Sequence, residues 1–325
     1  MRGEPVPAPA PAGSAARGGD GEPPLVSVVV TTRNRADSLA RLLASLSRQA
    51  YPRLQTIVYD DASEPPLRCE GGVLVIRGEE PRGACVGRNR CFEAVRGEFV
   101  LTLDDDTELD DPELVAKAVR LARRNPDVGM LVLREVLPGA GADPPGGGAL
   151  EVARPAFYGC LIRTDALRRA GMYLVEAFGY YAEEVELAIR MLDAGFRTVY
   201  VPSLAVRHHA DPRGRDLRRI YRLTARNTML TVLLRYPLRD VPRGLAGAVL
   251  MFLKRPPVEG RRDWAGPAWL AAQLLARLPL VLRSRAPVRR ATLLRHRQLG
   301  RRPEPAPLVP APEPARPAGG PAPPV

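Results

Sequence analysis

Continuous apolar runs that alternate with helical repeats are the feature of this sequence that most limits its fold. Residues 24–32 (PLVSVVVTT) form a β-branched run, typical of a strand buried on both faces of a parallel sheet. A helical repeat follows, in which the leucines of residues 39–46 share one face. We expect Asn34 and Asp37 to cap this helix.

The same alternation continues along the chain to about residue 202. We expect strands at 54–63, 72–78, 98–103, 128–136, 157–163 and 196–202, and helices at 84–96, 112–125, 164–171 and 182–195. The Gly- and Pro-rich stretch 138–148 is predicted to be a loop. This order is typical of an α/β fold of Rossmann-like type, with a mostly parallel sheet flanked by helices on both faces.

Three of the predicted strands end in polar clusters, at residues 31–33, 60–61 and 104–106. In parallel sheets the carboxyl ends of the strands meet at one edge, where ligands bind, so we expect the clusters to converge. On composition alone, the triplet 104–106 (DDD) would be a solvated acidic loop. Carboxylates one residue apart at a strand end can also bind a hard divalent cation, which leaves sites open for substrate phosphates. The second acidic cluster at the same edge favours a metal–diphosphate site.

The ends of the chain differ in composition from its middle. Residues 1–24 and 303–325 consist mostly of Pro, Ala and Gly and are predicted to be disordered. Between them we expect a globular domain at 25–236 and a basic, amphipathic helical extension at 237–302. The N-terminus lacks the apolar core of a signal peptide, and none of the four cysteines has metal-ligand spacing. We therefore expect a cytoplasmic protein with buried free thiols.

The net charge of +12 indicates an acidic partner, and residues 283–302 contain many arginines and no acid. Nucleic-acid binding would favour interleaved aromatic side chains, which this segment lacks, so we do not expect a nucleic-acid partner. None of the C-terminal helical stretches has the roughly 20 uninterrupted apolar residues of a spanning helix. The sequence therefore predicts a peripheral protein on an anionic membrane surface, at the inner face of the plasma membrane.

Several motifs, taken together in their order, resemble the family 2 glycosyltransferases of the GT-A fold. They are VSVVVTTRNRADSL, VYDDAS, GRNRCFEAVRGEFVLTLDDD, FYGCLIR, YYAEEVELAIRMLDAGFRTVYVP and VRHH, and the resemblance covers roughly residues 24–236. It implies an inverting, metal-dependent hexosyl- or deoxyhexosyltransferase. Such an enzyme would move a sugar from a nucleotide-diphosphate donor to a hydroxyl of a lipid-linked or cell-surface glycan.

The resemblance also implies roles for individual residues at the donor side. Thr31 and Arg33 match positions that contact the base of the sugar nucleotide, and Asp61 matches the acid that hydrogen-bonds this base. Arg88 matches a basic residue close to the nucleotide. Asp104 matches the first acid of the family's D-x-D pair, which lies near the ribose.

The remaining roles concern the metal and the acceptor. Asp106 matches the acid that binds Mg²⁺ or Mn²⁺, and His208 matches a histidine that completes the metal shell in some members. Glu184 matches the general base, where the family has Asp, and two Gly positions of the family are occupied here by Ala62 and Arg90. The other acids near the triplet are predicted to be solvated neighbours or helix caps; they are Asp105, Glu108, Asp110 and Asp111.

Two other functions compete with a glycosyltransferase. A nucleotidyltransferase would need a glycine-rich phosphate loop after its first strand, and TTRNRADS (31–38) contains no glycine. A degenerate transferase that serves as a scaffold at the membrane would be expected to have lost the D-x-D acids, which are present. An enzyme is therefore favoured.

Overall fold

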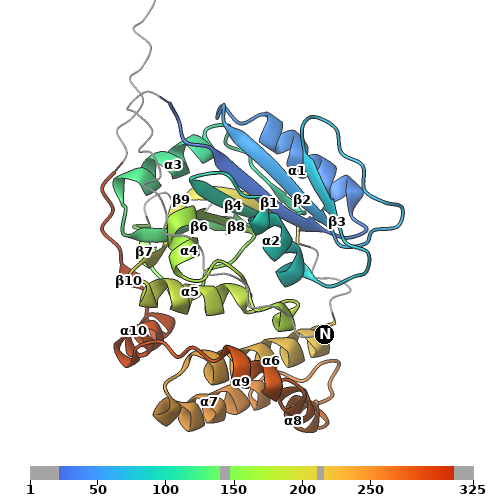
Figure 1. The fold of residues 1–325 in the computed structure, drawn as a ribbon, viewed down its shortest axis with the longest axis vertical. Coiled ribbons are helices and arrows are strands. Elements are labelled where there is room, and N and C mark those ends of the chain that lie inside the picture. Colours follow the sequence, from blue (N-terminus) through green and yellow to red (C-terminus); the bar gives the residue numbers. More distant parts are fainter. Residues whose placement is uncertain (1–21, 140–146, 211–215, 311–325) are drawn as a thin grey trace, which may run out of the picture.

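A computed structural model describes residues 22–139, 147–210 and 216–310 of the chain. Within these ranges, strands and helices alternate as in an α/β fold (Figure 1). The strands are β1 Val26–Thr32, β2 Leu54–Asp60, β3 Leu74–Arg77, β4 Phe99–Asp104, β5 Thr107–Glu108, β6 Val128–Val136, β7 Leu150–Glu151, β8 Gly159–Arg163, β9 Arg197–His208 and β10 Glu304–Pro305. The helices are α1 Ala36–Ser47, α2 Ala84–Glu93, α3 Leu114–Arg124, α4 Thr164–Arg169, α5 Glu183–Asp193, α6 Leu217–Arg235, α7 Val241–Leu253, α8 Gly266–Ala276, α9 Leu278–Ser284 and α10 Arg290–Arg301, with 3-10 turns η1 Glu176–Phe178 and η2 Leu238–Asp240.

The described strands form one sheet in the order β10-β7-β9-β6-β8-β4-β1-β2-β3, with β5 paired to β9. The run β4-β1-β2-β3 is parallel, and β6 is parallel to β9. Strand β8 lies antiparallel between β4 and β6. The predicted α/β class with a helix-flanked, mostly parallel core is confirmed.

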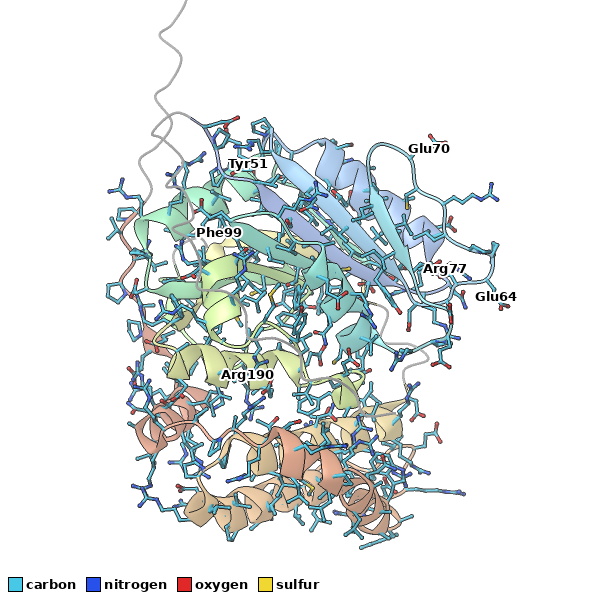
Figure 2. The ribbon with its side chains drawn as sticks, in the orientation of Figure 1. Tyr51, Glu64, Glu70, Arg77, Phe99 and Arg190 are labelled. Atoms are coloured by element: carbon cyan, nitrogen blue, oxygen red, sulfur yellow. The ribbon has the colours of Figure 1, made fainter. Side chains whose placement is uncertain are left out.

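The two faces of the sheet are covered by different helices because successive strand residues point to opposite sides. Val28 and Val30 pack with the leucines of α1 and the apolar side of α3. Val29 and Ile57 pack on the other face against α2, α4 and α5. Figure 2 places Phe99 within this sheet and Arg190 on α5, between the sheet and the C-terminal helices.

The register of the central strands brings their carboxyl ends together. In the ladder, Thr31 lies opposite Tyr59 on one side and Asp104 on the other, and Thr32 lies opposite Asp60. The polar clusters at residues 31–33, 60–61 and 104–106 therefore lie at one edge, as predicted.

Two local expectations were wrong. Neither Asn34 nor Asp37 caps α1, whose N-cap residue is Arg35 and has no side-chain cap bond. Instead Asn34 takes a φ of 54° and its side-chain oxygen accepts a hydrogen bond from the amide of Glu64 (2.8 Å). The strand expected at 196–202 extends to His208, because its second half pairs with β6 and β5.

The C-terminal helices form a further layer beneath α5 (Figure 1). Helix α6 packs against α7 and α8 through an apolar cluster that includes Met229, Phe252 and Leu270. Helix α10 returns to α5, where Leu293 packs on Ile189. The predicted tail 303–325 is described as far as residue 310, and in this part β10 pairs with β7. The other predicted tail lies outside the described residues, except for residues 22–24.

The central strands supply a stability prediction. Leu101 on β4 is 2% exposed, so Leu101→Ala should lower the free energy of unfolding by about 2–5 kcal/mol. Leu282 on α9 is 73% exposed, and Leu282→Ala should change the free energy of unfolding by no more than about 0.5 kcal/mol. Urea unfolding of both variants measures the difference, and equal losses would contradict the assignment of the core.

Candidate active site

The acidic triplet lies in a turn that joins β4 to the short strand β5. Thr107 donates its hydroxyl proton to the carbonyl oxygen of Asp104 (2.7 Å) within this turn. Strand β5 then pairs with the end of β9, where Thr107 lies opposite His208, and the amide of His209 donates to the carbonyl of Asp106 (2.8 Å). This pairing brings a histidine a hundred residues away to the acids.

His208 is oriented toward the acids by its surroundings. Its Nε2 lies 3.0 Å from Oδ1 of Asp106, and its Nδ1 lies 2.5 Å from Oε1 of Glu135 on β6. Tyr158 stacks on the imidazole, with ring centroids 5.4 Å apart. Burial alone would lower the pKa of His208, but the two carboxylates raise it to about 9. Glu135 and Tyr158 are site residues that the sequence did not indicate.

The ligand atoms of Asp104, Asp106 and His208 lie within 4.8 Å of one another. Two carboxylates and an imidazole suit a divalent cation such as Mn²⁺, and a carboxylate behind the histidine is a common outer partner of a metal ligand. The guanidinium of Arg35 lies beside this set and donates to Asp106 (2.8 Å), and this side chain is 45% exposed. These residues fit a divalent metal ion.

Asp105 is not the solvated neighbour that the sequence predicted. It is buried, and it accepts hydrogen bonds from the hydroxyl of Thr32 (2.7 Å) and from Arg35 (2.6 Å). Burial is the main cause that raises the pKa of Asp105 to about 6. This middle acid therefore ties the turn to the end of β1 and the start of α1, while its two neighbours belong to the set with His208.

Arg88 connects the acidic turn to helix α5. It is buried, and its two terminal nitrogens donate to Asp104 (2.8 Å) and to Glu183 (2.8 Å). The guanidinium also lies over the ring of Phe157, 5.0 Å from the ring centroid. Although burial alone would lower it, the carboxylates raise the pKa of Arg88 further above its usual value. The result is a fixed positive charge beside the triplet.

The three acids at the start of α5 have different partners. Glu183 pairs with Arg88, and Glu186 is fully buried and pairs with Arg190 (2.8 Å) and Arg235 (2.6 Å). Within the described part of the chain, Glu184 pairs with no cationic side chain. Burial, together with the negative charge of Glu183, raises the pKa of Glu184 to about 8. Glu184 is therefore the acid of this group that is suited to take up a proton.

The loop that leads into α5 is held by helix α6. Tyr181 and Ala182 both take positive φ angles, 73° and 64°, which L-residues rarely adopt. Asn227, fully buried on α6, donates to the carbonyls of Tyr180 (2.8 Å) and Tyr181 (2.7 Å), and Arg226 donates to that of Phe178 (2.6 Å). A polar Arg-Asn pair inside an apolar helical repeat was the sequence signal for this contact, which our sequence analysis missed.

The residues matched to nucleotide binding lie along the same edge. Thr31 is half-buried at the end of β1, and Arg33 is exposed just beyond it. Asp61 is buried and accepts from the backbone amides of Arg82 (2.7 Å) and Gly83 (3.0 Å), in the loop before α2. Gly83 has a φ of 89°, and a Cβ there would lie 2.8 Å from the carbonyl oxygen of Gly179, so this turn requires glycine.

Ala62 occupies a position where the family often has glycine. The backbone angle of Ala62 explains why glycine is suited to this position. Its φ is 57°, in the left-handed region that glycine adopts at no steric cost. The turn after Asp61 is thus retained with alanine.

Part of the chain is similar in sequence to known glycosyltransferases. Residues 27–143 match the family described as Glycosyl transferase family 2. An uncharacterized glycosyltransferase of Haemophilus influenzae is 31% identical over 111 residues, which are 33% of this chain and 37% of that protein. A Bacillus subtilis protein, TuaG, named as a candidate teichuronic acid biosynthesis glycosyltransferase, is 32% identical over 91 residues, 26% of this chain and 36% of that protein. The matches thus span about a third of the length of these relatives.

The fold has solved counterparts. A mannosyltransferase from Pyrobaculum calidifontis, solved in complex with GDP-Man and Mn²⁺, superposes with a TM-score of 0.52 at 17% identity, covering 87% of this chain and 88% of that one. The fold is therefore of the GT-A type, and residues 27–143 match the family 2 glycosyltransferases. The resemblance of the sequence motifs to this family is confirmed over that segment.

The contact between α6 and the α5 loop can be tested by mutation. Asn227→Ala leaves buried carbonyls without a donor, which should lower the free energy of unfolding by about 2 kcal/mol. It should also speed amide hydrogen exchange at residues 178–182. The control is Thr228→Ala, which removes a hydroxyl that bonds only within α6. Equal exchange in the loop of both variants would contradict the proposed contact.

Proposed function

We propose that this protein is an inverting, metal-dependent glycosyltransferase that uses a nucleotide-diphosphate sugar. The observation that carries the proposal is the convergence of Asp104, Asp106 and His208, which Arg88 links to the acids of α5. A scaffold protein would not need three potential metal ligands and a proton acceptor at one edge of the sheet.

The donor would lie across the carboxyl ends of β1, β2 and β4. In this proposal Thr31, Arg33 and Asp61 hold the base, and Asp104 contacts the ribose. Asp106 and His208 hold Mn²⁺ or Mg²⁺, which when bound supplies a Lewis acid for the charge of the diphosphate leaving group. The buried cation of Arg88 adds a fixed positive charge on the same side.

Glu184 would act as the general base. Its carboxylate pairs with no cationic side chain of the described residues, and its raised pKa suits a group that takes a proton from the acceptor hydroxyl near neutral pH. In a single displacement this deprotonation accompanies attack on the anomeric carbon, which inverts its configuration. Glu183 cannot fill this role equally well because its charge is already paired with Arg88.

The acceptor would be a hydroxyl of a lipid-linked or cell-surface glycan, and the transferred sugar a hexose or deoxyhexose. The strongly basic C-terminal helices support a location at the inner face of the plasma membrane. No helix in the described ranges is long and apolar enough to cross a membrane. The relative named for teichuronic acid biosynthesis supports a glycan acceptor.

The donor site is tested by thermal unfolding with Mn²⁺ and a panel of sugar nucleotides. The true donor at about 100 times its Kd should add about 2.7 kcal/mol of stability, seen as a raised Tm. Asp106→Ala should abolish the metal-dependent part of this shift. Asp110→Ala, which removes an acid paired with Arg207 at the surface, is the control and should keep it. No shift with any donor would reject the proposed activity.

The base is tested by Glu184→Gln. This variant should retain protection by the donor and lose about 10²–10⁴-fold in transfer rate, since only proton transfer is removed. In the unchanged protein the transfer rate should rise with pH and level off above an apparent pKa of about 8, because the base is active only when Glu184 has lost its proton. Glu93→Gln, at an exposed site, is the control. Normal transfer by the Glu184 variant would exclude this role.

A further inference from the structure

The C-terminal helices expose many large apolar side chains. Apart from Leu238 on η2 (77%), the most exposed belong to α7, α8, α9 and the turn before α8; they are Trp264 (81%), Leu282 (73%), Leu275 (71%), Leu250 (52%) and Leu253 (47%). Helix α8 contains no charged residue, and α7 and α9 contain one each. A surface helix of a globular protein normally has a polar outer face. We call residues 241–284, which comprise these three helices and the segment between α7 and α8, the α7–α9 layer; Figure 1 shows its helices at one end of the molecule.

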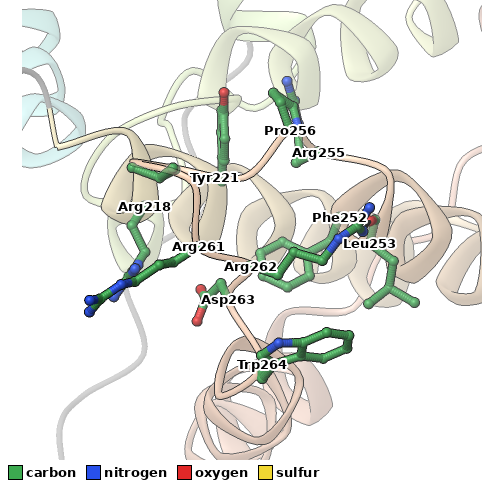
Figure 3. A pocket seen from close by; sticks show the side chains of 11 residues that line it. Arg218, Tyr221, Phe252, Leu253, Arg255, Pro256, Arg261, Arg262, Asp263 and Trp264 are labelled. Atoms are coloured by element: carbon green, nitrogen blue, oxygen red, sulfur yellow. Dashed lines mark hydrogen bonds between the residues drawn. The ribbon is translucent and has the colours of Figure 1, made fainter.

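Arginines surround a hollow that lies between α6, the end of α7 and the segment before α8 (Figure 3). Tyr221, Phe252, Leu253 and Trp264 supply apolar lining, and the cationic lining residues are Arg218, Arg255, Arg261 and Arg262. The acid in the lining is Asp263, which Arg222 neutralises with two hydrogen bonds of 2.6 Å. The hollow is therefore cationic, and its apolar wall includes the most exposed tryptophan.

The charge of the region favours an anionic partner. Residues 237–302 contain 15 Lys and Arg and three Asp and Glu, a net charge of +12 that equals the net charge of the whole chain. Apolar side chains that stand beside arginines match the boundary of an anionic bilayer, where acyl chains lie next to lipid phosphates.

The arginine-rich segment 283–302 is less suited to this contact than its composition indicates. Arg289 bonds to Asp193 on α5, and Arg295 pairs with Glu151 (2.9 Å) and Glu304 (2.7 Å). Arg285 donates to the backbone carbonyls of Leu233 and Tyr236. These guanidiniums hold α10 and its preceding turn to the body of the protein. The α7–α9 layer is therefore better suited to a membrane contact than this segment.

We propose that the α7–α9 layer is the surface that docks on an anionic membrane. Trp264, Leu275 and Leu282 enter the boundary between headgroups and acyl chains, and Arg261 and Arg262 contact lipid phosphates. The inference deepens the proposed function, on which it rests for the lipid-linked acceptor. Helix α6 packs on this layer and also holds the loop before Glu184. In a docked protein, α6 would therefore link the proposed base to the membrane-bound layer.

Liposome flotation of the full chain tests the docking. The protein should float with phosphatidylcholine vesicles that contain phosphatidylglycerol, and only weakly with phosphatidylcholine alone. The double variant Arg261→Gln, Arg262→Gln should lower the partition coefficient about thirtyfold, which corresponds to about 1 kcal/mol for each arginine. Trp264→Ser with Leu282→Ser should reduce binding by at least about tenfold, since both side chains are exposed and their loss spares the core.

The matched control is Arg301→Gln with Arg302→Gln, which removes the same charge from exposed positions at the end of α10. It should retain most of the binding, and an equal or larger loss would overturn the assignment of the surface. A concentration-dependent dimer without vesicles that Trp264→Ser abolishes would assign the layer to a second copy of the chain instead.

Donor protection measured on the same variants separates this inference from the proposed function. If the variants that lose vesicle binding still gain stability from the sugar nucleotide, the docking surface lies outside the donor site. A chain that floats as expected but binds no donor would leave the docking inference intact and reject the proposed activity. A chain that binds its donor but does not float would reject the docking inference alone.

Discussion

The buried guanidinium of Arg88 is the interaction on which the site depends. A charge removed from water is tolerated only when it is paired and hydrogen-bonded, and here Asp104 and Glu183 supply both partners at 2.8 Å. Asp104 ends strand β4 and Glu183 begins helix α5. The two ion pairs therefore fix the distance between the acidic turn and the start of α5. They also leave Glu184 as the neighbouring acid that pairs with no cationic side chain among the described residues, and its pKa is raised by burial and by the charge of Glu183. The division of roles among adjacent acids thus follows from one buried charge.

A second constraint comes from the C-terminal helices. Glu186 on α5 pairs with Arg235 on α6, and Asn227 on the same helix bonds to the carbonyls of the α5 loop. The strained backbone at Tyr181 and Ala182 persists because these contacts define it. The C-terminal layer is therefore both a structural support of the site and, in our proposal, the part that contacts the membrane.

Much of the fold could be predicted from local pattern. Uninterrupted β-branched runs identify strands buried on both faces, and parallel pairing then forces the acids at residues 61 and 104–106 to one edge. What failed depended on contacts distant in sequence. Asp105 differs from its neighbours only because Thr32 and Arg35 reach it, and no feature of DDD distinguishes the middle residue. Glu135 and Tyr158 lie on strands β6 and just before β8, far along the chain from the histidine that they orient.

By itself, the sequence determined the α/β class and the edge at which the polar clusters converge, since both follow from periodicity and from which residues end each strand. The roles of individual residues came from the resemblance of its motifs to a known family. Only the tertiary structure decided how those residues are paired. It extended β9 to His208 and so brought the imidazole beside Asp106, and it joined Arg88 to Glu183 and not to Glu184. It also paired Arg295 of α10 with Glu151 and Glu304, and left large apolar side chains of the α7–α9 layer exposed. The physical reason is that charge pairing and burial depend on distances in space, which a linear pattern does not contain.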